Sequence, residues 1–158
     1  MTKKTNSLKN KFIAKINQCD VENEKNKFRN NISFDFQFFD NSQDACQDFK
    51  DLSREQLFKL IDKLKEYCKN TPTYWQNRRI GAGGRKVFVI YGAFPEYSDF
   101  EHPKHVPLDV DWARFRLESD MRLIGFMVNE KTCEQFSICK NVFHVVFLDP
   151  NHGFYKSK

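Results

Sequence analysis

The chain has 158 residues and a net charge of +5, and 40% of its residues are hydrophobic. This length suits one domain with a core that needs no disulfide or metal support. The five cysteines include no CxxC pair, which argues against a zinc ribbon or a disulfide framework and favours a reducing, cytoplasmic location. No apolar run approaches the length of a membrane span, so we expect no membrane partner.

The positive charge is concentrated at the start of the chain. Residues 1–30 carry eight Lys or Arg against three Asp or Glu, whereas residues 31–158 carry eighteen of each. A polar, Lys- and Asn-rich segment buries little surface, so we predict a mobile basic leader over 1–30 and a single domain over 31–158. The leader is either a nucleic-acid-binding arm or a solubilising tail, and its composition favours the tail.

The first half of the domain is predicted to contain a strand and two helices. Alternating apolar residues over 32–38 predict a half-buried strand. Ser53 and Gln56 form the signature of a capping box that begins a helix. Its predicted buried stripe consists of the apolar residues at helical spacing, which are Leu57, Leu60, Ile61 and Leu64. Thr71 and Pro72 then start a short second helix that ends near residue 79.

The second half of the domain is predicted to be mainly strands. Glycines at 81, 83 and 84 precede a strand over 87–91, so they favour a flexible loop rather than a phosphate-binding loop. Residues 93–110 read as an irregular insertion, 112–117 and 121–128 as a hairpin, 129–141 as a polar connection, and 142–148 as a buried strand. We therefore predict an α+β fold, an antiparallel β-sheet meander with two helices packed on one face.

Arginines on the predicted hairpin are the first candidates for a functional site. Arg114 and Arg116 alternate along one strand and share a face, and Arg122 lies across the turn. Guanidinium groups in this arrangement can bind phosphates bidentately. The alternative is an outward charged face on which these arginines pair with Glu118 and Asp120.

A second basic region lies between the helices and the hairpin. No acidic residue occurs between Glu66 and Glu96, while this interval holds five basic ones. Four of them are candidate RNA-binding residues beside Arg114: Arg78, Arg79, Arg85 and Lys86.

The end of the last predicted strand supplies a second set of candidates. His152, Tyr155 and Lys156 follow the strand directly, where a rigid sheet could position them. A histidine can accept or return a proton near neutral pH, and a neighbouring lysine can stabilise negative charge. With the arginines, these groups suffice for metal-free cleavage of RNA by attack of a 2′-hydroxyl. The alternative is a plain turn followed by a frayed tail.

No metal or cofactor is required by this chemistry. A zinc site could be drawn from His102, His105, Cys133 and Cys139, or a metal-dependent enzyme from His102, His105 and His152, but nothing in the sequence fixes their relative positions. His144 lies inside the last strand and is expected to be a satisfied, partly buried histidine.

The segments WARFRLESDMRLIGFMV and NVFHVVFLDPNHGFY, with this order of elements, resemble the RelE/ParE superfamily of bacterial toxins. The superfamily includes the YoeB- and HigB-like mRNA endonucleases, which act on the ribosome. Arg116 and Arg122 match the arginines of the family's hairpin segment. His152 and Tyr155 resemble its terminal His–Tyr pair, although Gly153 and Phe154 separate them here.

The resemblance implies a RelE-like architecture and a toxin-type endoribonuclease of a bacterium or phage that cleaves mRNA. Arg114, Arg116 and Arg122 would then hold the scissile phosphate, and His152 would serve as general acid or base. Tyr155 would assist by hydrogen bonding or base stacking, Lys156 would add positive charge, and Glu118 would be the reserve general base. An antitoxin protein is the implied partner. The rival reading is a non-catalytic protein-interaction module on the same scaffold, antitoxin-like or a phage or host regulatory partner.

Overall fold

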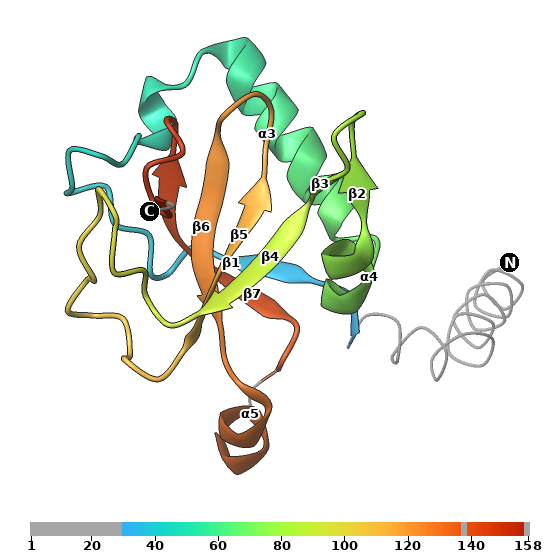
Figure 1. Cartoon of the computed structure of the whole chain (residues 1–158), viewed down its shortest axis with the longest axis vertical. Helices are drawn as coiled ribbons and strands as arrows, with labels where there is room; N and C mark the ends of the chain where they lie inside the picture. The colour runs from blue at the N-terminus through green and yellow to red at the C-terminus, as the bar shows by residue number, and fades with distance from the viewer. Residues whose placement is uncertain (1–29, 137–138, 157–158) are drawn as a thin grey trace, which may run out of the picture. The chain divides into compact units, whose positions relative to one another are not determined.

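The computed structural model describes residues 30–136 and 139–156, so the predicted leader lies outside the described residues except for Asn30. From Asn31 onward the described residues belong to one compact unit (Figure 1). Its strands are β1 (Ser33–Asp35), β2 (Arg79–Ile80), β3 (Arg85–Lys86), β4 (Phe88–Gly92), β5 (Asp111–Arg116), β6 (Arg122–Met127) and β7 (Val142–Asp149). Its helices are α3 (Arg54–Tyr67), α4 (Pro72–Asn77) and α5 (Glu130–Phe136), with a 3-10 turn η1 (Phe49–Asp51).

The main sheet has the strand order β1-β7-β6-β5-β4, and β2 and β3 form a separate small sheet. Strands β4 to β7 are antiparallel neighbours in chain order, which confirms the predicted α+β class and the antiparallel run. The meander does not extend to β1, because β1 pairs with β7 in parallel. No hairpin joins β1 to a neighbour, so local turn geometry does not dictate its direction.

Helix α3 begins as predicted and buries part of the predicted stripe. The Ser53 hydroxyl accepts a hydrogen bond from the Gln56 amide at 3.2 Å, and the Gln56 side chain accepts one from the Ser53 amide at 2.9 Å. Leu60 is buried and Leu64 packs partly buried against the core, as predicted, whereas Leu57 and Ile61 are 38% and 47% exposed. The buried stripe is rotated towards Tyr67, because the Tyr67 ring reaches the sheet and its hydroxyl donates to the Arg116 carbonyl.

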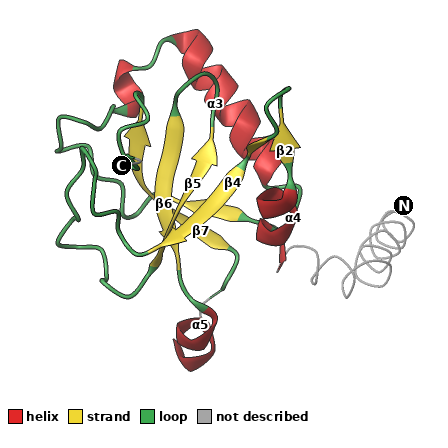
Figure 2. Ribbon diagram, viewed as in Figure 1, coloured by secondary structure: helices red, strands yellow, loops and turns green. Residues whose placement is uncertain are grey.

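Side chains on the two faces of the sheet form two separate cores. The first core lies between the sheet and helices α3 and α4, and includes Leu60, Tyr67, Trp75, Phe88 and Phe115. The second lies on the opposite face and is covered by irregular segments rather than helices (Figure 2). Its buried members include Phe100, Val106, Val110, Trp112 and Phe147. The insertion over 93–110 therefore supplies part of a core, although it has no helix or strand.

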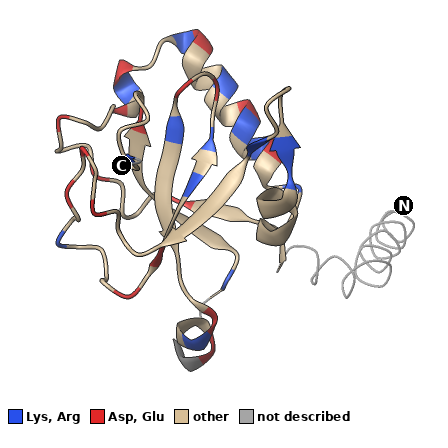
Figure 3. Cartoon of the chain, in the orientation of Figure 1, with Lys and Arg blue, Asp and Glu red and all other residues tan. Residues whose placement is uncertain are grey.

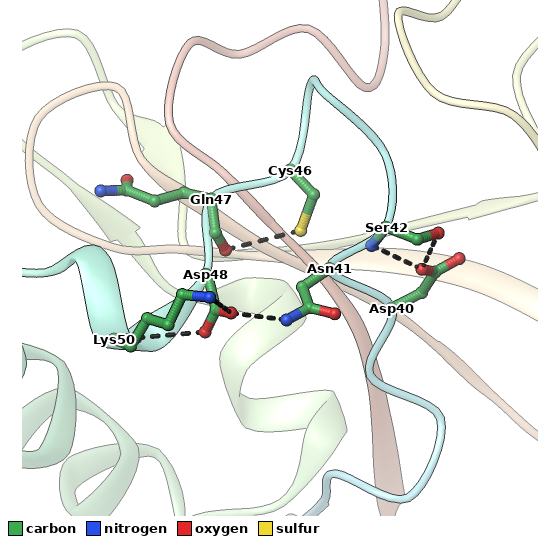
Figure 4. Close-up of polar contacts among 7 residues, drawn as sticks. All are labelled: Asp40, Asn41, Ser42, Cys46, Gln47, Asp48 and Lys50. Atoms are coloured by element: carbon green, nitrogen blue, oxygen red, sulfur yellow. Dashed lines mark hydrogen bonds and ion pairs between the residues drawn. The ribbon is translucent and has the colours of Figure 1, made fainter.

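The loop after β1 is held by its own side chains (Figure 4). Asp40 accepts hydrogen bonds from the amide and hydroxyl of Ser42 at 2.9 and 2.5 Å, and Asp48 caps η1. The Cys46 sulfur accepts from the Leu148 amide of β7 at 3.4 Å, and burial raises the pKa of this thiol to about 11. This loop is therefore fixed against β7 and can cover the second core.

Two predicted loops are more ordered than expected. Gly81 and Gly84, at φ +72° and +58°, form the turn that joins β2 to β3, where a left-handed backbone favours glycine. The connection over 129–141 contains α5, which begins with an Asn129 side chain accepting from the Thr132 amide at 2.9 Å. No helix in the described part of the chain is long and apolar enough to cross a bilayer.

Candidate phosphate-binding site

Three arginines on adjacent strands form what we call the arginine cluster: Arg114, Arg116 and Arg122. Arg116 lies directly opposite Arg122 in the β5–β6 register, and Arg114 is two residues from Arg116 along β5. The three side chains therefore share one face of the sheet, the face of the second core, as the alternation in the sequence predicted.

Two members of the arginine cluster are buried, and Arg114 is half-buried. Arg116 is 9% exposed and Arg122 is 2% exposed. Among the described residues, none of the three guanidinium groups forms an ion pair. Arg114 Nη1, Arg116 Nε and Arg122 Nε are buried nitrogens without a hydrogen-bond partner. Glu118, which the alternative reading paired with these arginines, instead lies 3.4 Å from Lys59.

Burial and mutual repulsion both act on the arginine cluster. Burial, followed by the charges of Arg116 and Arg114, lowers the pKa of Arg122 to about 10, although Asp120 and Asp149 oppose this effect. Burial also lowers the pKa of Arg116, with further lowering by Arg114 and Arg85. An anion bound near these guanidinium groups would relieve this repulsion.

Neutral oxygen acceptors orient two of the three arginines. Arg122 Nη1 donates to the carbonyls of Ser119 and Met121 at 3.0 and 2.7 Å. Arg114 Nε donates to the Tyr91 hydroxyl at 2.9 Å. These contacts fix the direction of the two guanidinium groups without neutralising their charge.

Tyr91 is a site residue that the sequence did not reveal. Its ring stacks on Tyr155 with centroids 4.7 Å apart and an interplanar angle of 2°, and its hydroxyl contacts Arg114. Burial raises the pKa of Tyr91, although the nearby Arg114 opposes this effect. The only available signal was Gly92, because glycine marks bulges and the β4–β5 register shifts between Ile90 and Gly92. Tyr91 therefore connects Tyr155 to Arg114 of the arginine cluster.

His152 lies in an exposed turn directly after β7. The Asp149 carboxylate accepts hydrogen bonds from the amides of Asn151, Gly153 and Phe154 at 2.9 to 3.1 Å. This turn holds His152 at φ 60°, an uncommon conformation for a residue other than glycine. Asp149 is the register partner of Arg122, so the turn starts beside the cluster. The His152 side chain itself makes no hydrogen bond, ion pair or ring contact within the described residues.

The other predicted RNA-binding residues differ in whether their charge is paired or exposed. The Lys156 side chain forms an ion pair with Asp99, which partly neutralises its charge. The Lys156 backbone amide donates to the Tyr97 carbonyl at 3.1 Å. Figure 3 shows Lys and Arg on β2, β3, β5 and β6, while Asp and Glu lie on α3, at the turn between β5 and β6 and along the loops at the left of the view. The exposed basic residues of the α4–β3 region are Arg78, Arg79, Arg85 and Lys86.

Two pockets meet at the β5–β6 turn, with volumes of about 490 and 570 Å³. Both are lined by Lys63, Leu117, Glu118 and Ser119, so they adjoin at this turn, and we call the two pockets together the turn groove. The larger pocket reaches Arg116 and the β2–β3 turn, and the smaller one reaches Pro150, two residues before His152. The lining of the turn groove therefore includes Arg116 of the arginine cluster and Glu118, whereas His152 lines neither pocket.

The structure holds no arrangement of donors for a metal within residues 30–136 and 139–156. There, no group of three or more His, Cys, Asp or Glu side chains is placed to hold an ion. His102 and His105 instead bond to the carbonyls of Pro103 and Phe38 at 3.0 and 3.1 Å. His144 is partly buried and satisfied as predicted, 2.7 Å from the Asp35 carboxylate.

Comparison with known proteins does not identify a relative. The chain matches no protein-family model, no curated protein and no solved structure.

Proposed function

We propose that the protein binds RNA through the arginine cluster and cleaves it as a toxin-type endoribonuclease of RelE-like architecture. The observation that carries this proposal is a group of three arginines, Arg116 and Arg122 buried and Arg114 half-buried, each with one unpartnered buried nitrogen and none with an ion pair among the described residues. Burying an uncompensated charge costs several kcal/mol, so such groups persist mainly where they bind something. A phosphate supplies both the missing charge and the missing acceptors.

The proposed reaction uses only groups of this chain. The 2′-hydroxyl oxygen attacks the adjacent phosphorus while its proton passes to a general base, and the bond from phosphorus to the 5′-oxygen breaks as that oxygen receives a proton. His152 acts as general acid or base, and Glu118 is the reserve base. Arg116 and Arg122 stabilise the charge that develops on the phosphate oxygens. Tyr155, stacked on Tyr91, supports an unpaired base.

Single-stranded RNA fits this arrangement better than a duplex. The Tyr91–Tyr155 stack offers an aromatic surface, since Tyr155 is 47% exposed although one face lies on Tyr91. Bases are available for stacking only when they are unpaired. Acceptance of mRNA on the ribosome and inhibition by an antitoxin belong to this proposal through the family resemblance alone.

The test is cleavage of a labelled single-stranded RNA by the full chain in the presence of EDTA. We expect products with a 2′,3′-cyclic phosphate and a 5′-hydroxyl, and we expect His152→Ala to lose cleavage while keeping binding. His105→Ala is the matched control, because His105 is also exposed but lies outside the site. Binding without cleavage by the unmodified protein would remove the nuclease part, and absence of binding would refute the proposal.

An apolar surface favours the second candidate, a protein-interaction module. Phe36, Leu57, Phe58 and Ile61 are 38 to 57% exposed, and a pocket of about 630 Å³ lies between β1 and α3. Exposed apolar patches commonly mark protein contacts. Expression of the chain in a bacterium distinguishes the two, because a nuclease arrests growth and loses this effect with His152→Ala, whereas an interaction module does not depend on His152.

A further inference from the structure

The larger pocket of the turn groove has the features of a site for a compact anion, and it shares Arg116 with the arginine cluster. It has a volume of about 570 Å³, within the range of small-ligand sites. Its cationic side chains come from three different elements: Lys63 of α3, Arg85 of β3 and Arg116 of β5. Because these cations line one pocket and do not form an extended row along the surface, they suit a ligand whose negative charge is concentrated at one end.

Arg116 is a buried cation without an ion-pair partner at this pocket. The residue is one of those that line the pocket and is 9% exposed, and its guanidinium forms no hydrogen bond or ion pair within the described residues. Arg85 is exposed and has no ion-pair partner there either. Lys63 forms an ion pair with Glu66 at 3.1 Å. The acidic Glu118, which also lines the pocket, forms an ion pair with Lys59 at 3.4 Å. The pocket therefore keeps a positive excess.

The register of the small sheet aims Arg85 at the pocket. Ile80 and Arg85 are opposite each other and both line it, while Arg79 and Lys86 form the other pair and do not. The glycine turn forms one wall, and the amides of Ala82 and Gly83 donate no hydrogen bond within the described residues. The oxygens of a phosphate next to this wall could accept hydrogen bonds from these amides as well as from the cationic side chains.

We propose that this pocket binds a terminal phosphate monoester, such as the phosphorylated end of an RNA strand. A monoester carries close to two negative charges and three acceptor oxygens at neutral pH, whereas an internal diester carries one charge. The excess of cations in a single pocket matches the monoester. The identity of the nucleic acid rests on the proposed function, but the monoester chemistry rests on the pocket.

The test compares 2′-O-methyl RNA oligonucleotides of one sequence with a 5′-phosphate, a 3′-phosphate or no terminal phosphate, because these strands lack the attacking hydroxyl and cannot be cleaved. We expect one of the phosphorylated ends to bind the full chain about tenfold more tightly than the unphosphorylated strand. Arg85→Ala should abolish that difference, while Lys86→Ala, which removes the same charge from the other face of the hairpin, should preserve it. Equal loss with both variants would overturn the site, because it would indicate general attraction only.

Further ligands separate this inference from the proposed function. Equal affinity for all three strands in the unmodified protein would refute the monoester pocket and leave RNA binding intact. Binding of adenosine monophosphate or inorganic phosphate that depends on Arg85, with no RNA bound, would support the pocket and refute the RNA proposal. Competition of adenosine monophosphate only with the phosphorylated strand would support both.

Discussion

Replacing Arg122 by methionine tests whether the arginine cluster is maintained at a cost to stability. The buried guanidinium has its pKa lowered to about 10, which corresponds to about 3 kcal/mol of preference for the unfolded state. At pH 7 the group is charged in both states, so this penalty applies in full, and it would disappear only as the pH rises above 10. Methionine removes the charge and keeps an unbranched apolar side chain.

The substitution also removes two hydrogen bonds. Arg122 Nη1 donates to the carbonyls of Ser119 and Met121, and each bond contributes about 1 kcal/mol. Ser119 is exposed, so its carbonyl can bond to water instead. The expected result is a gain of about 1 kcal/mol in the free energy of unfolding.

Urea denaturation at pH 7, followed by tryptophan fluorescence, measures this change without adding salt. Arg122→Lys is the control, since it retains a buried charge and should show no gain. Arg122→Met should also weaken RNA binding at least tenfold and reduce its dependence on salt. A loss of more than about 1 kcal/mol would show that the guanidinium is a structural group, and would contradict the reasoning.

Three further outcomes are expected. Leu60→Ala should cost about 2 to 4 kcal/mol in urea denaturation because Leu60 is 5% exposed, whereas Ile61→Ala, at 47% exposed, should cost less than about 1 kcal/mol. Gly125→Ala should prevent cooperative unfolding in a thermal scan, because a Cβ there would lie 2.1 Å from the His144 carbonyl oxygen. Burial raises the pKa of Asp35, but hydrogen bonds from Gln37 and His144 outweigh this effect and leave it below its ordinary value. The stability that Asp35 contributes is therefore present above about pH 4 and lost as the pH falls through the lowered pKa. In the Asp35→Asn variant, the free energy of unfolding should depend less on pH below about pH 4.

Features determined by neighbouring residues were predictable from the sequence. The capping box of Ser53 and Gln56 and the Thr71 cap of α4 depend on contacts within three residues, and both were confirmed. The alternation along β5 correctly placed Arg114 and Arg116 on one face, because side-chain direction in a strand is local.

Features determined by distant partners were not predictable in this way. The parallel direction of β1 depends on the free edge of β7, more than 100 residues later in the chain. The buried stripe of α3 depends on Tyr67, which packs on Phe115 with centroids 4.6 Å apart and cannot be recognised as a core residue from helix spacing alone. The contact between Tyr91 and Tyr155 likewise joins separate segments, and a bulge in β4 decides it.

The position of β7 between β1 and β6 has a consequence for protein synthesis. Strands β1, β4, β5 and β6 all leave the ribosome before β7, yet β1 has no sheet partner until β7 arrives. Asp149, which organises the His152 turn and lies opposite Arg122, is the final residue of that strand. The emerging chain therefore exposes the edges of β1 and β6 during translation, and the turn that carries His152 reaches the arginine cluster only when β7 has folded back onto the sheet.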